Sequence, residues 1–100
     1  LVDANCCYTP KKAIQIGHLL EEYGIRHFEE PCPYWELDQT KQVTDALKID
    51  VTGGEQDCDL VTWRQMIDMR AVDIVQPDIL YLGGISRTMR VVKMAGECRV

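Results

Sequence analysis

The sequence predicts an α/β fold in which four strands alternate with four helices and form one parallel sheet. Short apolar stretches suited to strands alternate with longer segments of helical periodicity, and each strand–helix pair takes about 25 residues. No hairpin signal such as Asn-Gly joins two apolar runs. Alternation without hairpins favours parallel strands joined by right-handed crossovers within a single domain.

The first two units occupy residues 1–47. The first strand ends within residues 1–5, and a helix begins at Thr9-Pro10, which supplies a capping hydroxyl and a proline suited to the first turn. Gly24 ends this helix, and a strand over residues 25–28 leads to a Pro-rich loop. The positions expected to face the core are Ala13, Ile16, Leu20 and Tyr23 in the first helix and Leu37, Thr40, Thr44 and Leu47 in the second.

The last two units have strands predicted over residues 49–52 and 71–75 and helices over 60–69 and 85–95. The fourth strand is almost wholly apolar, which is typical of a strand buried on both faces. Residues 99–100 are expected to begin a fifth strand. The inward-facing candidates are Leu60, Trp63, Met66 and Ile67 in the third helix and Met89, Val92 and Ala95 in the fourth.

Composition and charge narrow the class of protein. The net charge of −5 disfavours a nucleic-acid partner, because such partners are held by Lys and Arg. No apolar run approaches the roughly 20 residues of a membrane span, and no secretory leader is visible. The five cysteines are odd in number and form no CxxC pair, which disfavours a disulfide framework or a structural zinc site. We therefore expect a cytoplasmic protein.

Acidic residues recur at the C-terminal end of each predicted strand. Asp3, Glu29 and Glu55 are spaced 26 residues apart, and Asp78 follows after another 23. In a parallel sheet these ends share one edge, which is where ligands bind in α/β folds. The acids could instead cap helices or lie in solvated loops, but three in register favour a shared function.

A hard divalent cation would explain this register. Three converging carboxylates repel one another and raise each other's pKa unless a cation lies between them. Mg²⁺ prefers oxygen ligands and keeps positions for water or substrate oxygens. Cys6, Cys32 and Cys58 each follow one of these acids by three residues. These thiols could form a soft-metal site. We favour the interpretation that they are small buried side chains at equivalent turns of the repeated unit.

Five strings surround the acids in order: Val2-Asp3-Ala4-Asn5, Phe28-Glu29-Glu30-Pro31, Gly53-Gly54-Glu55-Gln56, Gln76-Pro77-Asp78 and Gly83-Gly84-Ile85. The series resembles the enolase superfamily, in its mandelate racemase/muconate lactonizing enzyme-like subgroup, over essentially the whole chain. The resemblance implies a (β/α)8 barrel, which typically takes about 250 residues. We therefore expect residues 1–100 to be a partial barrel domain, without the N-terminal capping domain and the remaining strands, and to be inactive alone.

The resemblance also implies residue roles. Asp3, Glu29 and Glu55 would bind Mg²⁺, and Asn5 would help to hold the substrate. Asp78 would orient a histidine on the next strand, beyond Val100, and so tune it as a general acid or base. The alternative for Asp78 is a turn cap. Neither histidine present fits this role: His18 is expected to face solvent and His27 to be packed or at an edge. The resemblance further implies that the full-length protein is a homo-oligomer.

The shared reaction of that family is removal of the proton α to a carboxylate, with Mg²⁺ stabilising the enediolate that forms. Residues 29–35 and 53–57 look most like those of the sugar-acid dehydratases. The resemblance therefore implies a lyase that converts an aldonate or aldarate, its small-molecule partner, to a 2-keto-3-deoxy acid. Tyr34 and Trp35 would line the mouth of the site or pack at the surface. Two alternatives stay open: a racemase or epimerase of a 2-hydroxy acid, and a non-catalytic truncated barrel fragment.

Overall fold

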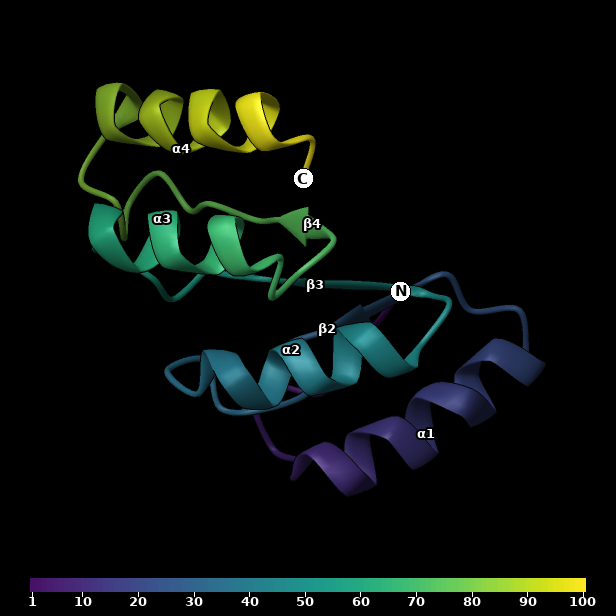
Figure 1. The fold of residues 1–100 in the computed structure, drawn as a ribbon. Helices are drawn as coiled ribbons and strands as arrows, with labels where there is room; N and C mark the ends of the chain where they lie inside the picture. The colour runs from purple at the N-terminus through teal and green to yellow at the C-terminus, as the bar shows by residue number, and fades with distance from the viewer.

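The computed structural model describes residues 1–100 and contains four strands and four helices in strict alternation (Figure 1). All strand pairs are parallel, in the order β1-β2-β3-β4, so the predicted α/β fold is confirmed. Figure 1 shows the helices following one another in chain order alongside the sheet. The elements are β1 (Val2–Asp3), α1 (Pro10–Glu22), β2 (His27–Glu29), α2 (Leu37–Ala46), β3 (Asp50–Gly53), α3 (Leu60–Met69), β4 (Ile74–Val75) and α4 (Ile85–Cys98).

The register of the strands separates a core face from a polar face. Phe28 pairs with Val51, and both are fully buried in the cluster that the sheet forms with the helices. Glu29 pairs with Asp3 on one side and with Thr52 on the other. Because successive strand residues point to opposite faces, this second row lies on the side of the sheet away from that core.

The core lies between the sheet and the helices. The α1 helix packs against α2, and α3 packs against α4. Trp63 is its largest fully buried side chain, and its indole N–H donates to the carbonyl oxygen of Asp57 at 3.1 Å. The predicted burial of Trp63, Met66 and Ile67 is confirmed. No helix is both long enough and apolar enough to cross a membrane.

Two expected core faces differ from the structure. Tyr23 is 78% exposed because it lies at the C-cap of α1, where the backbone has already left the helix. In α4, Ala95 is buried as predicted, but Met89 and Val92 are exposed and Val91 is buried in their place. This helix carries two apolar stripes, and periodicity alone does not show which of them faces α3.

The predicted fourth strand is present, but its expected burial on both faces and the expected start of a fifth strand are wrong. β4 lies at the edge of the sheet, and Ile74 is 36% exposed, so the strand is not buried on both faces. Residues 99–100 form no strand. Arg99 adopts a left-handed conformation at the C-cap of α4, and the N–H of Val100 donates to the carbonyl oxygen of Ala95. This pattern ends a helix by satisfying its last carbonyls.

All five cysteines are free. Cys32 is buried, whereas Cys6 is half-buried and Cys58 is exposed, so the expected burial of equivalent thiols holds for Cys32 alone. Burial raises the pKa of Cys32 to about 11. The thiolate, which is the reactive form, is therefore scarce at neutral pH.

Cys32 is expected to resist alkylation in the folded protein. With iodoacetamide at pH 8, peptide mass spectrometry should show Cys58 labelled and Cys32 labelled only after denaturation. As the pH is raised toward the pKa of Cys32, its residual labelling rate should increase about tenfold per pH unit, because the thiolate fraction increases by that factor. Equal labelling of both thiols in the native protein would contradict the burial of Cys32.

Candidate metal centre

The strand ends bring the three predicted ligands to one edge of the sheet. Asp3 is the last residue of β1 and Glu29 the last of β2, and they are register partners. Glu55 lies two residues beyond the end of β3. Asp3 and Glu55 are exposed, whereas Glu29 is only 8% exposed. The edge therefore presents one buried carboxylate between two solvated ones.

The electrostatics show that these acids act on one another. Burial raises the pKa of Glu29, the negative charges of Asp3 and Glu55 raise it further, and a hydrogen bond from Gln76 opposes the rise. None of the ion pairs in the structure involves any of the three acids. A buried carboxylate beside two others, without a cationic side chain, fits the oxygen-donor set that Mg²⁺ prefers.

The three carboxylates are near one another but not gathered at coordination distance. No three His, Cys, Asp or Glu side chains are close enough to hold a metal ion as they stand. Asp3 is turned to its own loop, where Oδ1 accepts the N–H of Asn5 at 2.7 Å. Repulsion between like charges keeps such side chains apart in the absence of a cation. Their role as a ligand set stays a prediction.

Left-handed backbone conformations cluster around this edge. Asn5, Cys6 and Glu30 have φ values of 48°, 62° and 41°, and Gly54 has a φ of 106°. Non-glycine residues rarely adopt such values, and strain of this kind clusters at functional sites. These residues redirect the chain near each strand end: two and three residues after Asp3, directly after Glu29 and directly before Glu55.

Glu30 is a buried acid that the sequence analysis left without a role. It is 4% exposed, and its Oε2 accepts hydrogen bonds from Gln56 Nε2 at 3.0 Å and from the Cys6 thiol at 3.3 Å. Burial, this bond and the Glu30 charge raise the pKa of Cys6 to about 12, so the thiol stays protonated and can donate. The adjacent acids in the Glu29-Glu30-Pro31 string were the only sequence signal for this network.

Gln76 is a second residue that sequence reasoning missed. Its Nε2 donates to Glu29 Oε1 at 3.1 Å, and its own Oε1 is buried without a partner. The bond fixes one oxygen of the Glu29 carboxylate. Partners of this kind orient metal ligands from outside the coordination sphere.

Asp78 and the two histidines pair with different groups. Asp78 Oδ1 accepts the N–H groups of Leu80 and Tyr81 at 2.7 and 2.9 Å, which is the turn-cap arrangement. Both bonds go to one oxygen, so the predicted bond to a histidine stays a prediction. His27 Nε2 lies 3.7 Å from Asp50 Oδ2. His27 is the first residue of β2, and Glu29 is the last. His18 is exposed on α1, as expected.

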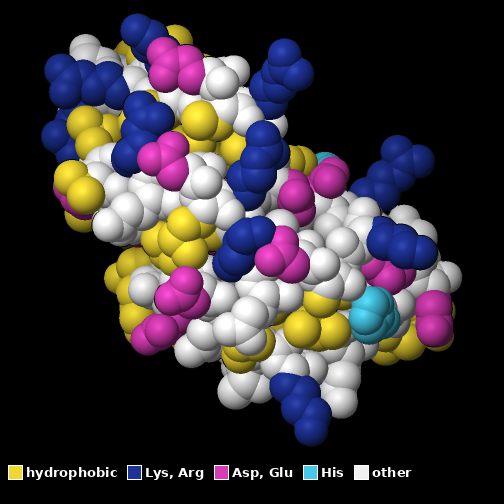
Figure 2. All heavy atoms as spheres, viewed as in Figure 1, with side chains coloured by type: hydrophobic (Ala, Val, Ile, Leu, Met, Phe, Trp, Pro, Cys, Tyr) yellow, Lys and Arg dark blue, Asp and Glu magenta, His cyan; other side chains and the backbone are white.

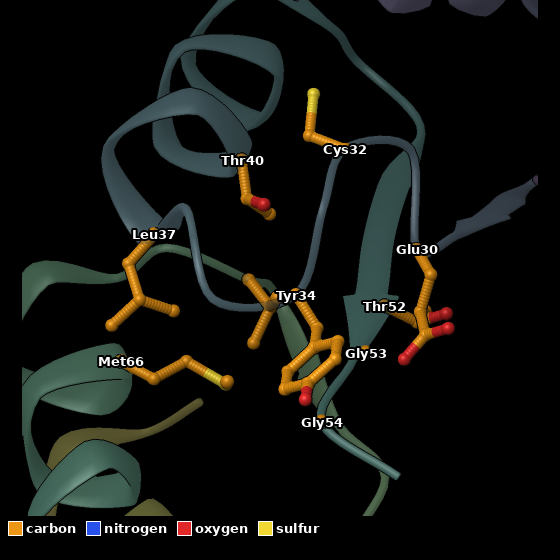
Figure 3. Close-up of a pocket in the computed structure, with 10 residues that line it drawn as sticks. Glu30, Cys32, Tyr34, Leu37, Thr40, Thr52, Gly53, Gly54 and Met66 are labelled. Carbon is orange, nitrogen blue, oxygen red and sulfur yellow. The ribbon is translucent and has the colours of Figure 1, made fainter. Parts of the chain in front are cut away.

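A small cavity of about 20 Å³ lies between β3, α2 and α3 (Figure 3). In this view Leu37 and Met66 lie on one side of the cavity, and Glu30 and Thr52 lie on the other. Tyr34 also lines the cavity, and its ring packs edge-on against Trp35, which is 64% exposed. Acidic and basic side chains are interspersed over the face in Figure 2, without a large region of one sign.

Comparison with known proteins assigns the whole chain to one family. The family model described as Enolase C-terminal domain-like matches residues 1–100. Arabinonate dehydratase of Saccharolobus solfataricus is 38% identical over 94 residues, which are 94% of this chain and 25% of that protein. A proposed racemase from Roseobacter denitrificans, known as a crystal structure, is 77% identical with a TM-score of 0.95, over 96% of this chain and 26% of that one.

A crystal structure of L-talarate/galactarate dehydratase from Salmonella typhimurium, liganded with Mg and L-lyxarohydroxamate, is 30% identical with a TM-score of 0.92. The match covers 97% of this chain and 25% of that one. Other relatives are named as a cycloisomerase, epimerases and further sugar-acid dehydratases. These matches confirm the predicted fold class, four βα units of a barrel domain. The chain spans about a quarter of the length of the curated relatives it matches.

Proposed function

Because the chain belongs to the enolase C-terminal domain-like family, we propose that it supplies the metal-binding part of an active site that removes the proton α to a carboxylate. Residues 1–100 would then be a partial barrel domain of a larger enzyme. The observation that carries the proposal is the buried carboxylate of Glu29, whose pKa is raised by burial and by the charges of Asp3 and Glu55.

Asp3, Glu29 and Glu55 are the residues that would hold Mg²⁺. When bound, this ion supplies positive charge that offsets the charge of the substrate carboxylate and the charge that develops as the α proton leaves. The three side chains offer only oxygen donors, and three protein ligands leave positions for a substrate carboxylate. Structures of relatives are described as liganded with Mg, which supports this choice of metal.

Other residues of the chain would orient groups around that site. Asn5 follows Asp3 in an exposed turn and is available to a substrate. Asp78 would orient a histidine through its second carboxylate oxygen. His18 pairs with Glu21 and His27 with Asp50, and neither is hydrogen-bonded to Asp78. We therefore assign the groups that transfer protons to the rest of the full-length protein. The full-length protein would be a homo-oligomer in the cytoplasm. The free cysteines suit that reducing compartment.

Dehydration of a sugar acid is the reaction we favour. Relatives that share 30% or more of their residues with this chain are named as dehydratases of arabinonate, of L-talarate or galactarate and of L-galactonate. Racemisation is kept as the second candidate, because the 77% identical crystal structure is described as a proposed racemase. A non-catalytic role is the remaining alternative.

The two reactions are separated by their products. The full-length protein should be incubated with Mg²⁺ and a panel of aldonic and aldaric acids in D₂O. We expect a 2-keto-3-deoxy acid from at least one member, detected as a new carbonyl compound. Exchange of the α proton with inversion, and no dehydration, would support the racemase. Binding of Mg²⁺ without either product on any acid would contradict the proposed dehydration, and absence of Mg²⁺ binding would support the non-catalytic alternative.

A further inference from the structure

We infer that Glu30 is a positioning residue of the metal centre, whose buried carboxylate ties the loops after β1 and β3 to the end of β2. In this way it holds the three candidate ligands in their relative places without binding the metal itself. The inference rests on the proposed Mg²⁺ site and adds to it a residue outside the ligand set.

The main chain of Glu30 already joins three strand ends. Its N–H donates to the carbonyl oxygen of Thr52 on β3 at 3.0 Å. Its carbonyl oxygen accepts the N–H of Cys6, in the loop after β1, at 2.8 Å. Glu30 directly follows Glu29, so these bonds fix the backbone next to the buried candidate ligand.

The side chain repeats the same connections. Oε2 accepts from the Cys6 thiol at 3.3 Å and from Gln56 Nε2 at 3.0 Å. Cys6 lies in the loop that follows Asp3, and Gln56 is adjacent to Glu55. A single carboxylate oxygen therefore links the two loops that present the exposed candidate ligands.

Stability alone does not account for a glutamate at this position. Its backbone is in the left-handed region, with a φ of 41°, which is strained for a residue with a side chain. Its Oε1 is buried without a hydrogen-bond partner, as is Thr52 Oγ1, and both residues line the cavity of Figure 3. Each of these features destabilises the fold. The contacts to the two ligand loops are what the carboxylate provides in return.

The test is the Mg²⁺ affinity of variants of the full-length protein, measured by isothermal titration calorimetry on samples shown by circular dichroism to be folded. Glu30→Ala is expected to weaken Mg²⁺ binding by about 10- to 100-fold, the range seen for partners of metal ligands. Glu30→Gln keeps one acceptor for Gln56 and should lose less. The turnover lost by either variant should be recovered in part at high Mg²⁺ concentration.

A matched control comes from the same cavity. Thr40 is buried in α2 and lines the same cavity, and its side chain makes no hydrogen bond to either ligand loop. Thr40→Val should change thermal stability while leaving the Mg²⁺ affinity within about twofold of the wild-type value. If Glu30 had a purely structural role, Glu30→Ala would likewise change thermal stability and leave the Mg²⁺ affinity unchanged.

A folded Glu30→Ala protein with wild-type Mg²⁺ affinity would overturn the inference and leave the proposed function intact. If Glu30→Ala does not fold, Gln56→Leu removes the bond from Gln56 to Glu30 together with the longer contact of Gln56 with the Cys6 sulfur at 3.9 Å. An unchanged Mg²⁺ affinity in that variant would overturn the inference as well. Failure of the wild-type protein to bind Mg²⁺ would instead refute the proposed function, and with it the role assigned to Glu30.

Discussion

Replacing Glu29 with glutamine in the full-length protein is expected to weaken Mg²⁺ binding by more than about 100-fold, beyond the range for groups outside the coordination sphere. Turnover should be lost with it. Thermal stability measured without metal should not fall. The pKa of Glu29 is raised in the fold, so above its ordinary pKa the ionised carboxylate opposes folding, and the substitution removes that charge. Calorimetry and thermal melts with and without Mg²⁺ measure both effects.

The matched control is Glu22→Gln, an exposed acid on α1. It changes the net charge equally and should alter neither Mg²⁺ affinity nor turnover, because surface substitutions act within about 0.5 kcal/mol. Glu55→Gln should resemble Glu29→Gln in its loss of metal affinity. Wild-type Mg²⁺ affinity in both ligand variants would refute the assigned metal site.

Gly54→Ala is expected to destabilise the protein by about 2–4 kcal/mol. The residue has a φ of 106°, and an added Cβ would lie 2.3 Å from Cη2 of the buried Trp63 ring. Strain in this backbone region costs about 1–3 kcal/mol, and overpacking of a core costs a similar amount. Chemical denaturation of the full-length variant measures the loss. Mg²⁺ affinity should also fall, because the next residue is Glu55.

Gly96→Ala provides the comparison for this glycine. Gly96 lies inside α4, and an added Cβ there would meet no heavy atom within 4 Å. Alanine favours a helix over glycine by up to about 1 kcal/mol, so this variant should be as stable as the wild type or more so. Similar destabilisation by the two substitutions would contradict the close contact between Gly54 and Trp63.

The alternation of elements was predictable because each element has a strong local signal. The third helix was predicted at its observed bounds, Leu60–Met69, and Trp63 and Ile67 are in the core as expected. The sequence did not show which of the two apolar stripes of α4 is buried. Both have helical spacing, and burial depends on which stripe packs against the neighbouring helix. The edge position of β4 likewise depends on pairing between distant segments.

The candidate site was predictable only in outline. Spacing placed Asp3, Glu29 and Glu55 at successive strand ends, and their mutual effect on the pKa of Glu29 agrees with that placement. The roles of Glu30 and Gln76 were not visible, because a hydrogen bond across 26 or 47 residues leaves no periodic signal. The turn cap at Asp78 was foreseen as an alternative and is present.

The most direct test of the metal site is a crystal structure of the full-length protein soaked with Mn²⁺, with an anomalous difference map to locate the ion. Mn²⁺ takes the same oxygen ligands as Mg²⁺. The predicted result is a single strong peak at the carboxyl edge of the sheet, coordinated by oxygens of Asp3, Glu29 and Glu55. A peak elsewhere in the molecule, or no peak within coordination distance of Glu29, would contradict the assignment.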